Sequence, residues 1–503
     1  MSTATPARSG IFSGHPPGLS LLFFTELWER FCYYGMRAML ALYVAAAFTQ
    51  GDPKAAGLKY GAFTALVYAT GIFGGAIADK FLGYQRAIIC GGIFIAAGEF
   101  CLLMPNENGF LFGLALMIVG NGLFKPNISA IVGKLYQQGD PKRDQGFTIF
   151  YMGINLGALI APLCCESIRT AFSEGGSLDG FRYAFAVAGF GMLIGLLTFV
   201  WGKSRLGVHG IPPAGKEGLG PSAVVMVGGV AVAGLCYFLL SEAAVLEYIL
   251  YALLALAVGK ILWTAAQHEQ AQKQRLWALL VLLFANIIFW AIFEQAGNSF
   301  TFFAENQVDR SVFGLFEFKT GWFQSVNAGM IVLFAPVFVA LWAFLDRTNK
   351  NPSIPAKFGW ALLFAGAGFF ALVISTKFAF PANASPEAEA RMNVGFYWLF
   401  ITYLLHTFGE LCLSPVGLSM VTKLAPPPMV GFTMGAWFMS ISIGNYLAGK
   451  ISASIGSAGK SADQMNLEDY NSVFSPIGWV MLGIGVLVLA ISPKVNRWMH
   501  GVK

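Results

Sequence analysis

Long apolar runs recur along this chain from Leu19 to Ser492, and they constrain its fold more than any other feature. A helix needs about 20 mostly apolar residues to cross the hydrocarbon core of a bilayer. Only 12% of the 503 residues are charged, whereas soluble domains carry about 25%. Because a helix satisfies its own backbone hydrogen bonds in lipid, the sequence predicts an all-α polytopic membrane protein and excludes a water-soluble fold.

The apolar runs predict about fourteen transmembrane helices in a six-plus-two-plus-six order. The first six are expected near 20–48, 59–79, 86–104, 110–133, 146–170 and 182–202, the hairpin near 222–240 and 245–266, and the second six near 276–303, 320–345, 358–376, 394–423, 430–455 and 473–492. The predicted domains are a tail (1–18), a six-helix bundle (19–203), a linker (204–221), a two-helix hairpin (222–268), a second six-helix bundle (269–493) and a tail (494–503). Two halves joined by a central connection are typical of secondary transporters.

Basic residues gather in the loops on one side of the predicted membrane. They include Lys80, Arg86, Lys134, Lys216, Arg347 and Arg497, whereas opposite loops mix signs, as at Asp309 and Arg310. Loops rich in Lys and Arg are cytoplasmic, so both termini are expected inside the cell. The basic residues are dispersed and form no dense patch, so we expect no nucleic-acid partner.

Enzymatic chemistry finds no support in the motifs. The chain has no His-Glu-x-x-His, no Gly-x-Ser-x-Gly and no complete ATP-binding Gly-x-x-x-x-Gly-Lys-Ser/Thr sequence. Its seven cysteines lie in apolar stretches without metal-binding spacing. We therefore expect no catalytic residue, no metal and no cofactor.

The first predicted helix concentrates ionisable and phenolic side chains. It reads Glu26-Leu-Trp-Glu29-Arg30-Phe-Cys-Tyr33-Tyr34-Gly-Met-Arg37. At about 100° per residue, Glu26, Arg30, Tyr33 and Arg37 fall on one stripe, and Glu29 and Tyr34 flank it. A charge in mid-bilayer costs about 3 kcal/mol or more. We predict a site where protons and anions are exchanged; a purely structural Glu26–Arg30 pair is the alternative.

Two further segments of the first half carry polar groups. Lys125 lies in mid-helix before Pro126 and needs a carboxylate neighbour, for which Glu26 or Glu29 is the candidate; a lysine that snorkels at a helix end is the alternative. Tyr151 and Asn155 are expected to line a cavity, although the small residues around them are equally typical of close helix packing.

Three predicted spans of the second half present polar groups inward, and the candidate residues on them are Trp290, Glu294, Asn298, Asn327, Glu410 and Ser414. Trp437 lies on a fourth span. His406 lies one turn before Glu410. It could relay protons, but a hydrogen-bonded packing histidine is favoured.

These charges favour a dipolar substrate. Its carboxylate would meet Arg30, Arg37 and Lys125, because a guanidinium takes a carboxylate in two parallel hydrogen bonds. Its amino group would meet Glu410. Aromatic walls, which would tolerate varied substrate side chains, would come from Tyr33, Tyr34, Tyr68, Trp290 and Trp437.

Three motifs resemble those of the bacterial proton-dependent oligopeptide transporters, a branch of the major facilitator superfamily. They are Glu26-x-x-Glu29-Arg30-Phe-x-Tyr33-Tyr34, the Phe150-to-Pro162 segment, and Gly409-Glu410-Leu-x-Leu-Ser414-Pro415-Val-Gly417-Leu. The loop from Gly75 to Arg86 is similar to the loop between the second and third helices of that superfamily. The resemblance implies the major facilitator fold, with the extra hairpin typical of prokaryotic members.

The same resemblance implies roles for individual residues. Glu26, Glu29, Arg30 and Lys125 would couple proton and peptide movement, and Arg37 and Glu294 would form an extracellular gate in which Glu294 binds a proton. The peptide pocket would be lined by Tyr33, Tyr68, Asn155, Trp290, Asn327, Glu410, Ser414 and Trp437.

The sequence therefore predicts a proton-coupled symporter that imports di- and tripeptides by alternating access across the bacterial inner membrane. The proton is the expected coupling ion, and a monomer is the expected functional form. Two alternatives stay open: the same fold carrying nitrate, an amino acid or a drug-like amphiphile, and a peptide sensor that does not transport.

Overall fold

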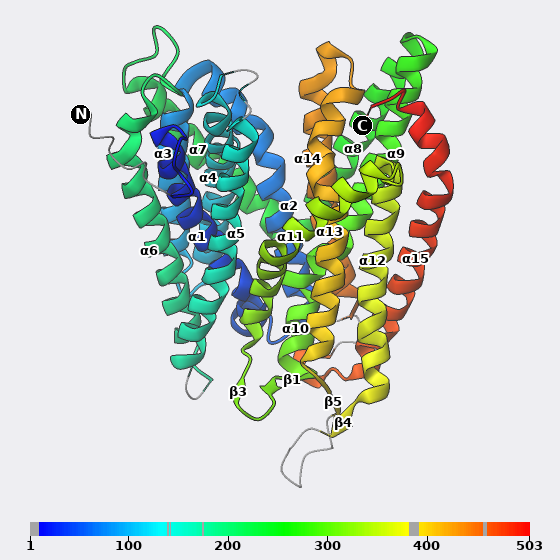
Figure 1. Cartoon of the computed structure of the whole chain (residues 1–503). Coiled ribbons are helices and arrows are strands. Elements are labelled where there is room, and N and C mark those ends of the chain that lie inside the picture. The colour runs from blue at the N-terminus through cyan, green and yellow to red at the C-terminus, as the bar shows by residue number, and fades with distance from the viewer. Residues whose placement is uncertain are drawn as a thin grey trace, which may run out of the picture. The chain divides into compact units, whose positions relative to one another are not determined.

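The computed structural model describes residues 10–137, 140, 142–173, 176–381, 392–455 and 460–502, so parts of both predicted tails, residues 1–9 and 503, lie outside it. Within these ranges the chain is nearly all helical (Figure 1). Twelve of the described helices are long and apolar enough to cross a membrane. With α3 and α14, of 18 and 26 residues, they confirm the predicted all-α polytopic fold of an integral membrane protein.

The helices follow the predicted spans in order. Those before the hairpin are α1 (Pro17–Phe48), α2 (Pro53–Ile77), α3 (Tyr84–Cys101), α4 (Glu107–Lys134), α5 (Lys142–Ala171) and α6 (Asp179–Gly202). The hairpin is α7 (Gly220–Ser241) and α8 (Ala243–Gln267). Those after it are α9 (Gln270–Phe293), α10 (Ser299–Asn306), α11 (Phe323–Arg347), α12 (Ile354–Ser375), α13 (Tyr397–Leu424), α14 (Val430–Ile455) and α15 (Leu467–Trp498).

The predicted continuous span 276–303 needs a correction. The α-helix ends at Phe293, a 3₁₀ turn covers Glu294–Gly297, and α10 begins at Ser299. Asn298 between them has φ −129° and ψ −100°, which no helix adopts. A Cβ on Gly297 would overlap the Tyr60 hydroxyl group, so the close approach of α2 accompanies the break. The expected face of Trp290, Glu294 and Asn298 is therefore not a regular helical stripe.

Short strands connect the helices at one end of the second half. β1 (Val308–Asp309) pairs in parallel with β5 (Met392–Gly395), with Val308 opposite Val394, and β5 pairs antiparallel with β4 (Phe380–Pro381). β2 (Ser311–Val312) and β3 (Phe316–Glu317) form an antiparallel pair. These pairings tie the loops after α10 and α12 together.

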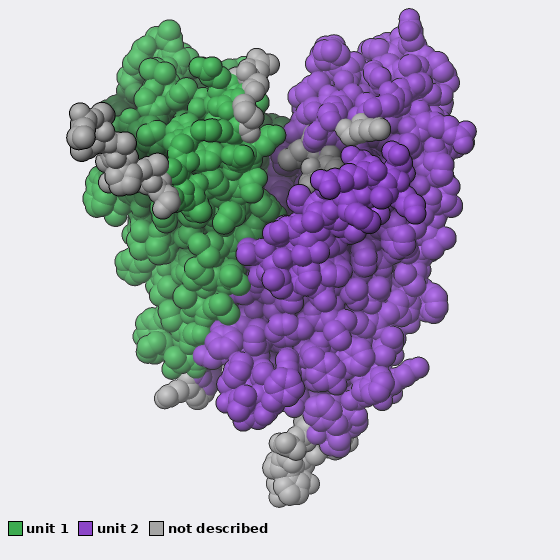
Figure 2. Space-filling view, in the orientation of Figure 1, with its two compact units in different colours: residues 1–36, 70–172, 182–237 green, residues 37–69, 173–181, 238–503 purple. Residues whose placement is uncertain are grey.

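The chain divides into two compact units, shown in different colours in Figure 2. Unit 1 contains residues 1–36, 70–172 and 182–237, and unit 2 contains residues 37–69, 173–181 and 238–503. Helices α1 and α2 each belong partly to unit 1 and partly to unit 2, and the hairpin is divided after Tyr237. These units do not coincide with the predicted six-helix bundles, which end at 203 and begin at 269. The bundle boundaries stay a prediction.

Within unit 1, glycines bring α2 and α4 into backbone contact. A Cβ on Gly74 would lie 1.7 Å from the Gly122 carbonyl oxygen, so Gly74 has no room for a side chain. Asn127 Nδ2 donates to the carbonyls of Leu123 (2.7 Å) and Gly74 (3.2 Å). Pro126 has no backbone N–H, so it cannot donate the regular helical hydrogen bond to the Gly122 carbonyl. The small residues near Lys125 therefore serve the contact between α2 and α4.

Candidate functional site

The polar cluster of α1 is built around Arg30, which chelates its neighbour in sequence. Arg30 Nε and Nη2 donate to the two carboxylate oxygens of Glu29 at 2.5 and 2.6 Å, and Arg30 Nε lies 3.4 Å from Glu26 Oε1. The side chains of Arg30 and Glu29 are 2% and 0% exposed. One guanidinium group thus faces two buried carboxylates, and the predicted Glu26–Arg30 pair is present but is the longer of the two contacts.

Helices α4 and α5 complete the surroundings of this cluster. Arg30 Nη2 donates to Asn121 Oδ1 at 3.3 Å, and Lys125, one turn further along α4, interacts electrostatically with Glu26. Glu26, one of the two predicted carboxylate neighbours, is therefore within electrostatic reach of Lys125. On α5, a Cβ on Gly157 would lie 2.9 Å from the Arg30 Cβ, so α5 packs closely against α1 beside the arginine.

Aromatic rings flank the guanidinium group of Arg30. Its Cζ lies 5.1 Å from the ring centroid of Tyr33 and 5.9 Å from that of Tyr34. Cation–π contacts of this kind stabilise a charge that has left water. Glu26, Glu29, Tyr33 and Tyr34 are therefore gathered around Arg30 within unit 1, whereas Arg37, which was predicted to lie on the same stripe, belongs to unit 2.

Arg37 belongs to unit 2 and has different neighbours. Its Nη2 pairs with Glu294 Oε2, and its Nε donates to the Tyr60 hydroxyl oxygen at 2.6 Å. The exposed fractions of Arg37 and Glu294 are 7% and 1%. The contact between the two residues of the predicted gate is present, and Tyr60 is an additional partner that the sequence did not suggest.

Around this pair, α2 packs directly on α14. A Cβ on Gly61 would lie 2.7 Å from Gly449 Cα, and one on Gly449 would lie 2.6 Å from the Gly57 carbonyl oxygen. Asn298 Nδ2 donates to that same Gly57 carbonyl at 3.3 Å, and Ser442 Oγ donates to the Ala65 carbonyl at 2.7 Å. Asn298 thus contacts α2 through its Nδ2, its buried Oδ1 accepts no hydrogen bond in the described structure, and its role as a substrate ligand stays a prediction.

This glycine contact yields a first testable prediction. Gly449→Ala would force α2 and α14 apart, because the added methyl group meets backbone atoms, and overpacking of this kind costs about 1–3 kcal/mol. We expect a lower thermal unfolding temperature in detergent and slower solute uptake in liposomes. Gly431→Ala on the same helix is the control, because a Cβ there meets no atom within 4 Å. Equal effects of the two substitutions would contradict the assignment.

Unit 2 also holds the predicted acid on α13. Glu410 Oε2 accepts a hydrogen bond of 3.0 Å from Asn327 Nδ2, which lies 3.0 Å from Thr407 Oγ1 as well. Glu294 interacts electrostatically with Glu410. Glu410, Asn327 and Glu294, which lie on three different segments of the sequence, are therefore brought together.

The remaining predicted residues are distributed as follows. Trp290 donates to Asn286 Oδ1 at 3.1 Å, and Trp437 is buried against Phe358. Tyr68 and Ser414 are half-buried. Tyr151 is exposed, whereas Asn155 is buried and donates to the Tyr151 carbonyl.

His406 has the surroundings of a packing residue. Its Nε2 lies 3.2 Å from the Ala365 carbonyl oxygen, and its ring packs among those of Phe293, Phe300 and Phe369. The structure therefore favours the packing interpretation over the proton relay.

Comparison with known proteins identifies the family. The model of the POT family matches residues 85–467. The chain belongs to the POT family. It is 34% identical to the peptide transporter YePEPT of Yersinia enterocolitica over 100% of this chain and 99% of the relative. It is 33% identical to a di-/tripeptide transporter of Lactococcus lactis subsp. cremoris, over 98% of each chain.

A solved structure shows the same fold at full length. The crystal structure of a peptide transporter POT in complex with sulfate superposes with a TM-score of 0.80 at 35% sequence identity. The superposition covers 99% of this chain and 98% of that one. The POT-family fold, which is that of the major facilitator superfamily, therefore extends over both units.

Two buried ionisable clusters of this POT-family chain escaped the sequence reasoning. Glu99 on α3 is fully buried and accepts a hydrogen bond of 3.2 Å from Cys32 Sγ. Arg169 on α5 chelates Glu166 at 2.7 and 2.6 Å. A charged residue inside a predicted span was the signal available for both.

Metal binding is not indicated in the part of the POT-family chain that the structure describes. There, no three His, Cys, Asp or Glu side chains form a group that could hold a metal ion. Several of the buried carboxylates instead pair with arginines, as in Glu29–Arg30, Glu294–Arg37 and Glu166–Arg169.

Proposed function

We propose that this protein is a proton-coupled symporter that imports di- and tripeptides by alternating access. The observation that carries the proposal is the presence of acid–base clusters deep inside spanning helices, at Arg30 with Glu26 and Glu29 and at Arg37 with Glu294. Such groups are costly in a membrane, so they are rare there and often mark the path of protons or substrate. The names of the Yersinia and Lactococcus relatives support peptide as the cargo.

Peptide recognition would use opposite charges at its two ends. The substrate carboxylate would bind Arg30 and Lys125, and its amino group would bind Glu410, whose carboxylate is oriented by Asn327. The aromatic residues Tyr33, Tyr34, Tyr68, Trp290 and Trp437 would contact the side chains of the peptide. Few side-chain-specific contacts would be needed, because the peptide termini supply most of the charge-assisted hydrogen bonds.

Proton coupling would act through the Arg37–Glu294 pair. While Glu294 is ionised, it holds Arg37, and the packing of α2 on α14 keeps the extracellular side closed. Protonation of Glu294 removes the attraction and favours opening. Loss of the proton to the cytoplasm, assisted by Glu26 and Glu29, then releases the peptide inside. No catalytic residue takes part.

The Lys- and Arg-rich loops support a place in the bacterial cytoplasmic membrane with both termini inside. Uptake of a panel of di- and tripeptides into proteoliposomes, with and without an uncoupler, tests the proposed function directly. Concentrative uptake that the uncoupler abolishes is the expected result. Competition by nitrate but not by other dipeptides would contradict peptide as the cargo, and absence of counterflow would support a sensor instead.

A second prediction concerns Glu410. Glu410→Gln removes the charge that would bind the substrate amino group while keeping a hydrogen-bond acceptor. Since hydrogen bonds to charged groups contribute about 1.5–3 kcal/mol, the KM for dialanine should rise about 10- to 100-fold. N-acetyl-dialanine, which has no amino charge, is the matched substrate, and its weaker uptake should not change. A loss that is equal for both substrates would contradict the role of Glu410.

A further inference from the structure

Helix α7 of the hairpin forms one wall of an apolar cavity within unit 1. The cavity has a volume of about 790 Å³, within the size range of ligand sites. Its other walls come from α2 and α4. The lining residues on which the argument depends are Thr70, Phe73, Phe81, Lys216, Val224 and Gly228.

The polarity of this lining is confined to one end. Thr70 donates its hydroxyl hydrogen bond to the Ile118 carbonyl at 3.1 Å, so its polar group is already satisfied. Lys216 is the charged residue of the lining, and it precedes α7 in the chain. The rest of the cavity is an open groove, in which Phe73 and Val224 are 67% and 71% exposed. On membrane-spanning helices such surfaces meet hydrocarbon.

The end of the groove at Lys216 has a fixed backbone. Arg86 Nη1 donates to the carbonyls of Gly218 (2.6 Å) and Lys216 (3.2 Å), and its Nη2 donates to that of Glu217. The ammonium group of Lys216 lies 5.8 Å from the ring centroid of Phe81, another lining residue. Arg86 therefore holds the backbone of Lys216, and the Phe81 ring lies beside its ammonium group.

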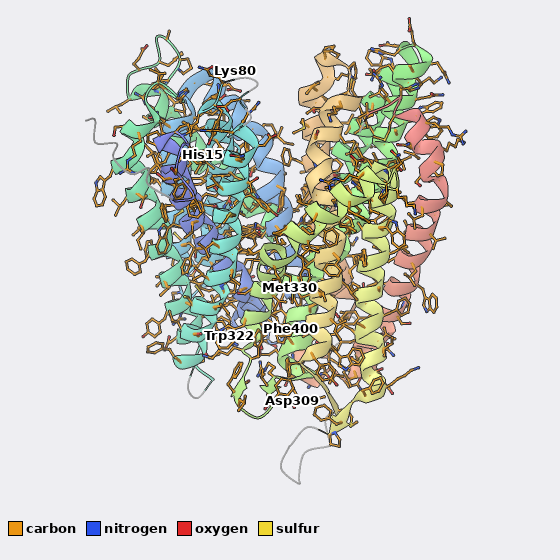
Figure 3. The ribbon with its side chains drawn as sticks, in the orientation of Figure 1. His15, Lys80, Asp309, Trp322, Met330 and Phe400 are labelled. Atoms are coloured by element: carbon orange, nitrogen blue, oxygen red, sulfur yellow. The ribbon has the colours of Figure 1, made fainter. Side chains whose placement is uncertain are left out.

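Positive charge dominates this end. Lys80 precedes Phe81 and lies toward the same end of unit 1 as His15 (Figure 3). Lys134 Nζ lies 4.7 Å from the ring centroid of Tyr84, whose hydroxyl donates to Asp79.

The acidic groups at this end have partners of their own. Asp79 accepts the Tyr84 hydrogen bond, and Glu217 Oε1 accepts one of 3.0 Å from the Gly215 N–H. Backbone N–H groups of Glu217 and Gly215 lower the pKa of the Glu217 carboxyl. Both acids are thus engaged locally, and Lys80, Arg86, Lys134 and Lys216 outnumber them.

We propose that this groove is a binding site for one anionic phospholipid, with an acyl chain along α7 and the head group on Lys216. The lining residues of α7 run from 221 to 235, about 21 Å at 1.5 Å per residue, enough for a chain that fills one leaflet of about 15 Å. A peptide or polar drug would leave its polar groups unsatisfied against this lining. The basic residues at this end favour binding of an anionic head group over a zwitterionic one.

The chain offers a matched pair of glycines to test the acyl-chain site. Gly228 lines the groove and Gly234 does not, both lie on α7, and a Cβ on either meets no atom within 4 Å. Native mass spectrometry of protein from phosphatidylglycerol/phosphatidylcholine nanodiscs would measure retained lipid. Gly228→Phe should lose the bound phosphatidylglycerol, and Gly234→Phe should keep it. Equal retention by both variants would overturn the proposed site.

The head-group contact is tested by Lys216→Gln in the same nanodiscs. One basic residue near the membrane surface favours an anionic lipid about fivefold, so the preference for phosphatidylglycerol over phosphatidylcholine should fall by about that factor. Lys494→Gln, at the far end of the sequence, should leave the preference unchanged. Equal retention of both lipids by the wild-type protein would overturn the anionic assignment.

Discussion

Glu294→Gln is expected to abolish proton-driven accumulation of dipeptide. Glutamine cannot ionise, so the Arg37–Glu294 pair could no longer open and close with protonation. A membrane potential of 100 mV acting on one charge supplies about 2.3 kcal/mol, equivalent to about fiftyfold accumulation. In liposomes with a proton gradient, the variant should reach an inside-to-outside ratio of about one, whereas the wild type concentrates the peptide.

The control must separate a loss of proton coupling from a loss of correct folding in the Glu294→Gln variant. Removing one partner of a buried ion pair costs about 3–5 kcal/mol, so misfolding alone could stop accumulation. Counterflow of dialanine, which needs no gradient, should persist in Glu294→Gln and report a folded carrier. Glu305→Gln on α10 removes a charge from a partly exposed pair with Arg310 and should accumulate peptide normally. If Glu294→Gln still concentrated dipeptide, the coupling role would be wrong.

The second large effect is expected at Arg30. Arg30→Lys keeps the positive charge but cannot chelate Glu29 through two parallel hydrogen bonds. Loss of one charge-assisted hydrogen bond, about 1.5–3 kcal/mol, should lower kcat/KM for proton-driven dipeptide uptake about 10- to 100-fold. The measurement is initial uptake rate against dipeptide concentration at fixed pH.

Arg169→Lys provides a matched control for this substitution. Arg169 chelates Glu166 in the same bidentate way, at 2.7 and 2.6 Å, and is also buried. No transport role is proposed for that pair, so Arg169→Lys should lower the unfolding temperature comparably while retaining uptake. Equal losses of uptake in both variants would show that only structural integrity is being measured.

Most of the fold could be predicted because span formation is a local property. An apolar run of sufficient length becomes a helix in lipid whatever lies elsewhere in the chain, and each of the fourteen expected spans corresponds to a helix or helix pair. The break after Phe293 was missed, because it accompanies the contact of Gly297 with Tyr60. No window of sequence around Glu294 contains that information.

The candidate site was only partly predictable. The sequence indicated that Lys125 needs a carboxylate, but it left Glu26 and Glu29 equally open. The structure shows that Arg30 chelates Glu29 and that Lys125 interacts electrostatically with Glu26. Adjacent residues on a helix point about 100° apart, so periodicity does not predict the Glu29–Arg30 contact. Asn121 and Tyr60 were overlooked because uncharged polar residues give a weak signal in a membrane span.

By itself the sequence determined that this is a helical membrane protein with ionisable residues inside its spans, because burial of charge in lipid is costly enough to mark such residues wherever they occur. The tertiary structure alone decided how these charges are shared, because Arg30 lies closer to Glu29 than to Glu26, and Arg37 contacts Tyr60 as well as Glu294. Arg30 and Arg37 lie two turns apart on one helix, yet they belong to different units and hold different carboxylates. The reason is that the contacts of Arg37 with Glu294 and Tyr60 depend on distances of a few ångströms between different helices, and helix packing sets those distances.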